Sequence, residues 1–337
     1  GNVKMGKLFG VVLILLSISI FADNFMMPQD VEKYLVDKDY EIIMKDVKPN
    51  TYFADFITDF TVIKNQNTGK YELKTYTVDT DITKEINKGN EFFTSKSYTE
   101  AISNYKYALT KGTKYNILYN KIALSYFLLK DYDNATEYAV MGTNQNHSNF
   151  YLYNLLGKIA MKKKDTLFAL EYLLKSLIND PNNKETIQLL SSVLKEDKKI
   201  YNDYIFNPSI SYEIKDSKVK VSMDKGLPKY WRAYINVHLK YYFEKPDPDI
   251  FNCKNFNCEY EALWNLIIAY ASEDHKKDPK VERILNMNES GFLNSFIYFN
   301  IIGRRDIPTL LTLNDVEKNL ILNMIKKYFI KKVEVKK

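Results

Sequence analysis

The chain has 337 residues, of which 45% are hydrophobic and 27% are charged, with a formal net charge of +6. This composition can fill a hydrophobic core, and the length predicts two or three domains. Because basic and acidic residues are interspersed rather than blocked, the sequence excludes the concentrated basic surface that is typical of nucleic-acid-binding proteins.

The N-terminal residues have the layout of a secretory signal. Lys4 and Lys7 precede an apolar run from Leu8 to Phe21, which the small residue Ala22 follows. The run is shorter than the roughly 17–25 residues of a membrane-spanning helix. We therefore predict a signal peptide over residues 1–22 and an exported protein, periplasmic or secreted. The alternative is an uncleaved segment that anchors the chain to the inner membrane.

Residues 23–81 predict a small mixed α/β segment. Val31 and Leu35 follow Pro28 at helical spacing, which indicates a short helix. The stretch FTVIKNQNTGKYELKTYTV, residues 60–78, alternates apolar and polar residues on both sides of a turn near Asn67 to Gly69. This pattern predicts a β-hairpin.

From residue 82 onward, small residues recur every 34 positions without insertion. They form two columns, which are Gly89, Ala123 and Gly157 in the first and Ala101, Ala135 and Ala169 in the second. Aromatic residues keep the same register less strictly. An irregular helical bundle has no reason to keep one spacing, so the period predicts a helical-repeat solenoid.

The pattern resembles the tetratricopeptide repeat family, whose unit is two antiparallel helices in about 34 residues. The resemblance implies a mostly α fold, with three repeats and a capping helix over residues 82–199. It places the first column where the two helices of a pair cross, and the second column where the second helix presses on the first. Residues 184–196 continue in register, with Leu190 and Leu194 in first-helix columns, and predict the cap.

The resemblance also implies a groove lined by the first helices, which is the usual ligand site of such solenoids. Asparagine amides can donate to and accept from a peptide backbone, and Phe and Met offer apolar pockets that tolerate varied partners. The inward-facing columns give the predicted partner-binding residues Asn90, Phe93, Asn120, Leu124, Phe127, Asn154, Lys158 and Met161. The predicted partner is a protein or peptide. In the alternative, the N-terminal segment or the C-terminal domain fills the groove.

One mode of binding does not fit the inner positions. Family members that hold the terminal carboxylate of a chaperone use Lys and Arg at set places. Here those places carry Ile86, Lys121, Tyr151 and Leu155, and only Asn90 matches. We therefore do not expect carboxylate clamping.

Residues 200–337 predict a mostly helical C-terminal domain that carries a β-hairpin. Apolar residues alternate over residues 210–223 on both sides of Asp216 and Ser217. Four later stretches, residues 231–244, 259–271, 291–302 and 314–329, have the spacing or apolar content of helices.

The sequence shows no recognisable reaction chemistry. The chain has two cysteines, Cys253 and Cys258, which predict a local disulfide in an oxidising compartment or else free thiols. A zinc site would need about two further ligands, and no histidine lies at ligand spacing from this pair. His238 lies on the apolar stripe of its helix, which indicates a core role. Without a phosphate loop, paired-His motif or Gly-flanked serine, we predict no catalytic residue, no metal and no cofactor.

Three functions fit these patterns. The favoured one is a non-catalytic scaffold or adaptor of the bacterial cell envelope that binds a polypeptide in the groove. The alternatives are a periplasmic small-ligand-binding protein and a hydrolase-like C-terminal domain with the repeats as its docking arm.

Overall fold

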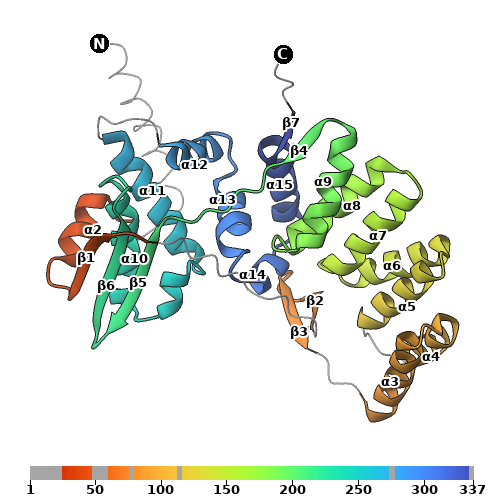
Figure 1. The fold of residues 1–337 in the computed structure, drawn as a ribbon. Helices are drawn as coiled ribbons and strands as arrows, with labels where there is room; N and C mark the ends of the chain where they lie inside the picture. Colours follow the sequence, from red (N-terminus) through yellow and green to blue (C-terminus); the bar gives the residue numbers. More distant parts are fainter. Residues whose placement is uncertain (1–24, 48–59, 76–78, 112–115, 273–277, 334–337) are drawn as a thin grey trace. The chain divides into compact units, whose positions relative to one another are not determined.

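The computed structural model describes residues 25–47, 60–75, 79–111, 116–272 and 278–333 (Figure 1). The chain divides into two compact units, each built from two separate stretches. One, here called the α/β unit, comprises Gly1–Phe53 and Ile205–Arg305; the other, the repeat unit, comprises Ala54–Tyr204 and Asp306–Lys337. The predicted signal over residues 1–22 lies outside the described residues.

The predicted domain boundaries at residues 81 and 199 differ from this division. The segment 23–81 is not one body, because its first strand pairs with a strand from the C-terminal half, whereas its hairpin belongs with the repeats. Similarly, residues 306–337 join the repeat unit, where the strand β7 (Ile330–Lys332) pairs with β4 (Lys199–Tyr201). The boundaries of the two units therefore follow from strands that are distant in the sequence and pair with each other.

The repeat unit is built on three antiparallel helix pairs, as predicted (Figure 1). The pairs are α3 (Thr80–Thr94) with α4 (Tyr98–Thr110), α5 (Asn116–Leu128) with α6 (Tyr132–Gln145), and α7 (Phe150–Lys162) with α8 (Thr166–Asn179). The three alanines of the second column, Ala101, Ala135 and Ala169, are fully buried.

The first column lies at the helix crossings, which confirms the basis of the repeat prediction. A Cβ atom on Gly89 would lie 2.5 Å from Cε1 of Tyr105, and one on Gly157 would lie 2.7 Å from Cγ of Leu173. Each partner follows its glycine at the same interval in the sequence. At the equivalent place in the second pair, Ala123 is matched by Ala139, and both are buried in one cluster. A large partner thus occurs where the column holds glycine, and a small partner where it holds alanine.

The turn inside each repeat is also periodic. A left-handed lysine ends the first helix of every pair and recurs after α9 (Lys184–Glu196); the four residues are Lys96, Lys130, Lys164 and Lys198, with φ values of 64°, 62°, 61° and 53°. The amide after the lysine donates to a carbonyl earlier in the helix, as from Asp131 to Tyr126 at 3.0 Å. This pattern is a Schellman motif, which satisfies the last carbonyls of a helix and turns the chain sharply.

Helix α9 follows the third pair as the first helix of an incomplete fourth repeat. It continues the repeat register, as predicted, and its Leu190 and Leu194 are buried. After Lys198 the chain continues as strand β4 instead of a second helix. The C-terminal helix α15 (Asp315–Met324) packs against α8, and α14 (Ile307–Leu311) contacts both α8 and the hairpin of β2 (Phe60–Lys64) and β3 (Tyr71–Thr75).

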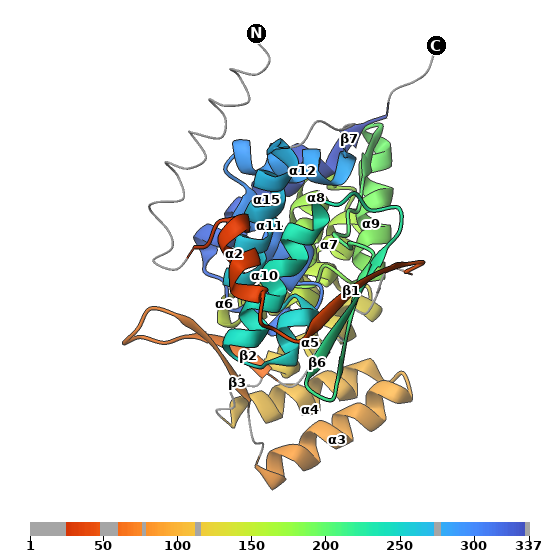
Figure 2. The same ribbon diagram turned by 90° about the vertical axis from the view of Figure 1, so that its left-hand side faces the viewer.

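The α/β unit contains a three-stranded sheet with the order β1–β6–β5 (Figure 1), of which Figure 2 shows β1 and β6 from another side. Strands β5 (Ile210–Lys215) and β6 (Lys218–Asp224) form the predicted hairpin, and β1 (Tyr40–Lys45) adds parallel to β6 with Tyr40 opposite Val219. The parallel edge strand was not predicted, because its apolar residues Ile42, Ile43 and Met44 lie in succession without alternation.

Helices complete the α/β unit. They are α2 (Pro28–Leu35), α10 (Trp231–Glu244), α11 (Phe256–Ser272), α12 (Pro279–Glu289) and α13 (Leu293–Phe296), with a 3₁₀ turn at Pro248–Asn252 and a π-helical turn at Ile297–Ile302. The predicted short helix is present as α2; its Val31 and Leu35 are buried, and it packs against α10 and α11. No helix in the described part of the chain combines the length and apolar character needed to span a bilayer.

The crossing geometry predicts a coupled effect of two substitutions. Gly157→Ala should lower the free energy of unfolding by about 1–3 kcal/mol through overpacking against Leu173. Leu173→Ala alone should cost about 2–5 kcal/mol through a cavity. The double variant copies the Ala123 and Ala139 pair, so it should be more stable than the sum of the single effects by about 1–2 kcal/mol, measured by urea denaturation. Strict additivity would contradict this packing.

Candidate functional site

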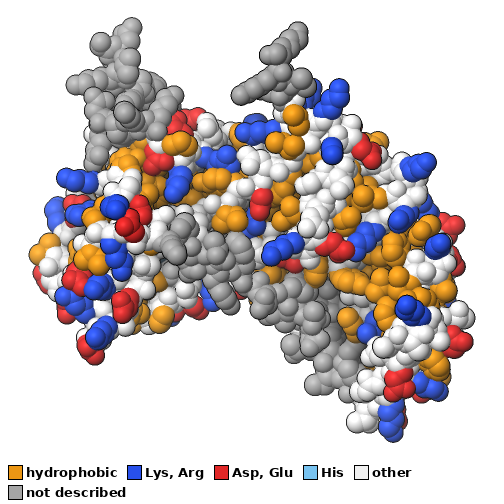
Figure 3. Space-filling model, viewed as in Figure 1, with side chains coloured by type: hydrophobic (Ala, Val, Ile, Leu, Met, Phe, Trp, Pro, Cys, Tyr) orange, Lys and Arg blue, Asp and Glu red, His pale blue; other side chains and the backbone are white. Residues whose placement is uncertain are grey.

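The predicted groove residues lie on the first helices α3, α5 and α7, in the register that the repeats require. Asn90 and Phe93 are on α3, Asn120, Leu124 and Phe127 on α5, and Asn154, Lys158 and Met161 on α7. All but the buried Asn154 are partly exposed. Hydrophobic side chains gather over the region of α5 to α7 on the face that Figure 3 shows.

The asparagines of this set form hydrogen bonds within the protein, which differs from the expectation that they bind a peptide backbone. Asn154 Nδ2 donates to Thr186 Oγ1 on α9 at 2.9 Å, and the Asn154 side chain is only 5% exposed. Asn120 Oδ1 accepts a hydrogen bond from Asn149 Nδ2 at 2.8 Å. These bonds join neighbouring helices, so the two asparagines hold the repeats together.

Asn90 is engaged in the same way. Its Oδ1 atom accepts from the Tyr105 hydroxyl at 2.9 Å and from Lys121 Nζ at 2.8 Å. The Lys121 ammonium also lies 5.6 Å from the centre of the Tyr105 ring. Burial lowers the pKa of Lys121. Within the described residues, no carboxylate lies at ion-pair distance from this lysine, whereas Lys158 pairs with Glu185 at 2.7 Å.

The two phenylalanines of the predicted groove are partly exposed and pack against a tyrosine that follows the turn of the same repeat. Phe93 packs edge-on against Tyr98 with ring centres 5.4 Å apart, and Phe127 packs against Tyr132 at 5.7 Å. Leu124 packs against the core of the second pair. Each of these side chains packs against the protein on one side and is partly exposed to solvent on the other. This is expected of residues that contact an apolar side chain of a partner.

A second feature of the repeat unit is the buried lysine Lys318 on α15. Its Nζ donates to Ser148 Oγ at 2.5 Å, to Asn179 Oδ1 at 2.8 Å and to the Leu311 carbonyl at 3.1 Å. It borders a cavity of about 170 Å³ that Tyr153 also lines. Burial lowers the pKa of Lys318 to about 7, only partly opposed by the charge of Asp315. These three acceptors are neutral, so the ammonium has no direct bond to a carboxylate among the described residues.

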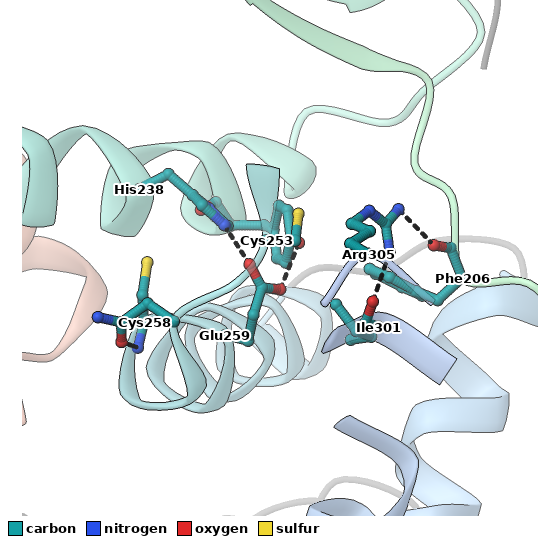
Figure 4. Close-up of polar contacts among 9 residues, drawn as sticks. Phe206, His238, Cys253, Cys258, Glu259, Ile301 and Arg305 are labelled. Atoms are coloured by element: carbon teal, nitrogen blue, oxygen red, sulfur yellow. Dashed lines mark hydrogen bonds and ion pairs between the residues drawn. The ribbon is translucent and has the colours of Figure 1, made fainter. Parts of the chain in front are cut away.

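A third feature is a buried polar cluster in the α/β unit (Figure 4). His238 on α10 and Glu259 on α11 are fully buried and face each other, with His238 Nε2 2.7 Å from Glu259 Oε1. His238 Nδ1 lies 2.9 Å from the Tyr234 carbonyl, which can only accept, so Nδ1 carries a proton. The Tyr234 hydroxyl donates to the second carboxylate oxygen at 2.7 Å.

The charges in this cluster are paired. Burial opposes a charge on His238, but the negative charge of Glu259, 2.7 Å away, stabilises the protonated ring, and the His238 pKa lies well above its ordinary value. Burial also opposes ionisation of Glu259, but His238 and the bond from Tyr234 bring its pKa below the ordinary value. Because burial raises the pKa of Cys258 to about 11, that thiol is neutral near pH 7. The carboxylate of Glu259 is therefore the counter-charge of His238.

The two cysteines, Cys253 and Cys258, are free thiols in this structure, which is the second of the two states that the sequence left open. The thiols lie on opposite sides of the Glu259 carboxylate (Figure 4). Cys258 is buried in the first turn of α11, whereas Cys253 follows the 3₁₀ turn in a left-handed conformation and is partly exposed. A short separation in the sequence thus does not bring the sulfur atoms together.

The cluster meets a pocket of about 120 Å³ whose lining includes Asn207, Tyr212, Tyr234, Phe251, Cys253 and Arg305. One ligand atom each from His238, Cys253 and Glu259 lie within 4.8 Å of one another, so these residues could hold a metal ion. With both ring nitrogens engaged, His238 is not placed as a base for the Cys253 thiol. Sequence reasoning assigned His238 to the core, which is confirmed, but missed its partners, because α11 supplies them only once the helices pack.

Parts of the chain are similar to known proteins. No protein-family model matches the chain. The Hsp70-Hsp90 organising protein of Plasmodium falciparum (isolate 3D7) is 30% identical over 158 residues, which are 44% of this chain and 27% of that protein. This chain therefore spans about a quarter of the length of that relative.

Solved tetratricopeptide domains are similar to part of the chain. The first such domain of Spaghetti (RPAP3), bound to an Hsp90 peptide, is 24% identical with a TM-score of 0.34, covering 35% of this chain and 95% of that domain. The Sgt2 domain from Aspergillus fumigatus is 21% identical with a TM-score of 0.34, covering 35% and 80%.

Burial of Lys318 predicts a distinctive pH dependence. Its folded pKa of about 7 lies below the ordinary value of 10.5, so between these values the unfolded chain binds more protons and stability rises with pH. Urea denaturation from pH 7 to pH 9 should show the wild type gaining up to about 1.4 kcal/mol per pH unit relative to Lys318→Met. Parallel curves for the two proteins would show that the lysine is solvated.

Proposed function

We propose that this protein is an adaptor that holds a segment of a partner polypeptide against helices α3, α5 and α7. The observation that carries the proposal is a set of partly exposed apolar side chains on the first helices, Leu124, Phe127 and Met161, together with Lys121 of α5, which has no carboxylate partner in the described part of the chain. Apolar anchors surrounded by polar groups are typical of peptide-binding surfaces.

The hydrogen bonds of Asn154 and Asn120 to neighbouring helices narrow the set of residues that can contact the partner. Asn154 and Asn120 stabilise the packing of neighbouring helices, so the contacts are made by the apolar rows and by Lys121. An acidic group of the partner would complement Lys121, because its ammonium donates to the neutral amide oxygen of Asn90. Such a charge-assisted bond in a partly desolvated place contributes more than an exposed ion pair.

The relative supports a polypeptide as the partner. Its name describes a protein that organises Hsp70 and Hsp90, both of which are polypeptides. Of the places expected to clamp a terminal carboxylate, one holds Lys121, but the others hold the uncharged residues Ile86, Tyr151 and Leu155. We therefore propose that the groove recognises an internal stretch that combines apolar and acidic residues.

We further propose that the adaptor acts in the bacterial cell envelope. The basic start, the apolar run from Leu8 to Phe21 and Ala22 support export across the inner membrane. Mass spectrometry of the N-terminus from fractionated cells tests this part by itself. A mature chain that starts at Asp23 supports it, and a full-length chain in the cytoplasm contradicts it.

Site-specific photocrosslinking tests the groove. A photoreactive residue in place of Leu124 should crosslink to a partner, whereas the same residue in place of Tyr107, which is 50% exposed on the second helix α4, should not. With the captured partner purified, Phe127→Ala and Lys121→Gln should each weaken binding by at least about fivefold, measured by calorimetry. The effect of Lys121→Gln should shrink in high salt.

Two outcomes would contradict the proposal. Equal crosslinking from positions 124 and 107 would show that the first helices are not the binding surface. Unchanged affinity in both variants, with wild-type circular dichroism, would show that the partner binds elsewhere.

A further inference from the structure

The buried cluster of the α/β unit places three different donor types around one point. His238 Nε2, Cys253 Sγ and a carboxylate oxygen of Glu259 all lie within 4.8 Å of one another. In a tetrahedral zinc site the bond lengths place neighbouring ligand atoms about 3.3–3.6 Å apart. Since Nε2 and Oε1 are 2.7 Å apart, small rotations of these side chains would open the space for an ion.

The surrounding hydrogen bonds already orient the three donors. The Tyr234 carbonyl accepts from Nδ1 of His238, which leaves Nε2 as the atom directed at Glu259. The Tyr234 hydroxyl holds the other oxygen of Glu259. In metal sites, the ring nitrogen of a histidine that does not bind the metal usually donates to a carbonyl or carboxylate, and a carboxylate ligand usually accepts a hydrogen bond from a neighbouring group.

A third observation, the environment of Tyr212, points to a ligand at this place. The Tyr212 hydroxyl is buried and has no hydrogen-bond partner among the described residues. Its ring lies 5.9 Å from that of His238, and Tyr212 lines the same pocket as Cys253. Buried polar atoms are normally satisfied, so an unpaired hydroxyl at this place indicates an ion, or a water bound to one.

We propose that His238, Cys253 and Glu259 bind a single Zn²⁺ ion, with the fourth position open to the pocket and its ligand hydrogen-bonded to Tyr212. A thiolate, an imidazole and a carboxylate together suit zinc, whereas Mg²⁺ and Ca²⁺ prefer oxygen ligands. Three protein ligands with one open position differ from a closed structural site. Binding replaces two protons, that of the Cys253 thiol and that on His238 Nε2, and both leave to solvent.

Arg305 lines the same pocket and gives it a positive charge. Its guanidinium donates to the carbonyls of Ile301 at 2.8 Å and Phe206 at 3.3 Å, which fix its direction (Figure 4). A small anion or carboxylate at the metal would lie beside this cation, so the pocket favours an acidic ligand over a cationic one.

Titration of the full-length, reduced, metal-free protein with Zn²⁺ tests the site. We expect one ion per chain by calorimetry, and no heat with Mg²⁺. Replacement by Co²⁺ should produce a sulfur-to-cobalt absorption band, which a site without Cys253 cannot give. Cys253→Ser, at a partly exposed position, should abolish the band and weaken Zn²⁺ binding by at least about 100-fold, while Tyr212→Phe should keep the band and weaken binding by about 10-fold or more.

Cys258→Ala is the matched control, because Cys258 is the second thiol beside His238 but lies outside the set of three donors. It should keep both the stoichiometry and the band. Failure of the wild type to bind Zn²⁺ tightly, or a cobalt band that Cys253→Ser retains, would overturn the proposal and leave His238 and Glu259 as a structural ion pair. Since the measurement reports metal alone, its failure leaves the groove proposal unaffected.

Discussion

Each pair of helices in the repeat unit packs closely because the first helix carries a small residue where the second helix crosses it. Gly89 leaves room for the Tyr105 ring and Gly157 for Leu173, while Ala123 faces the smaller Ala139. An added methyl group at either glycine would enter a neighbouring side chain. The constant spacing of the repeats follows from this constraint, because a crossing repeats only if both helices and both turns keep their lengths.

The sequence predicts this part of the fold because the interactions are local and repeated. Small residues and the helix stripes each leave a pattern within one segment, and so does the hairpin turn at Asp216 and Ser217 in the α/β unit. The left-handed lysines could also have been found, since Lys96, Lys130, Lys164 and Lys198 keep the period. Strand β1 and the division into units depend on pairing between distant segments, such as Tyr40 with Val219, which leaves no local pattern.

The candidate sites show the same difference between local features, which the sequence predicts, and contacts between distant segments, which it does not. Register alone placed the groove residues on the correct helices, but it could not show that Asn154 bonds to Thr186 or that Lys121 reaches Asn90. Those bonds depend on how one repeat lies on the next. Likewise, His238 looked like a core residue from its helix stripe, and only the packing of α10 on α11 brings Glu259 to it. Hydrogen-bond partners and the burial of Asn154 therefore required the structure, whereas the periodicity of the helices did not.

The most direct test of the account is to remove one whole repeat. Deletion of residues 116–149 takes out one period and leaves the α3–α4 and α7–α8 crossings intact. Urea denaturation followed by circular dichroism should show a protein that still unfolds cooperatively, with less helix and lower stability than the wild type. The shorter deletion of residues 118–147 shifts the register and should abolish cooperative unfolding of the repeats. Equal behaviour of the two deletions would contradict the claim that a constant interval between crossings holds the solenoid together.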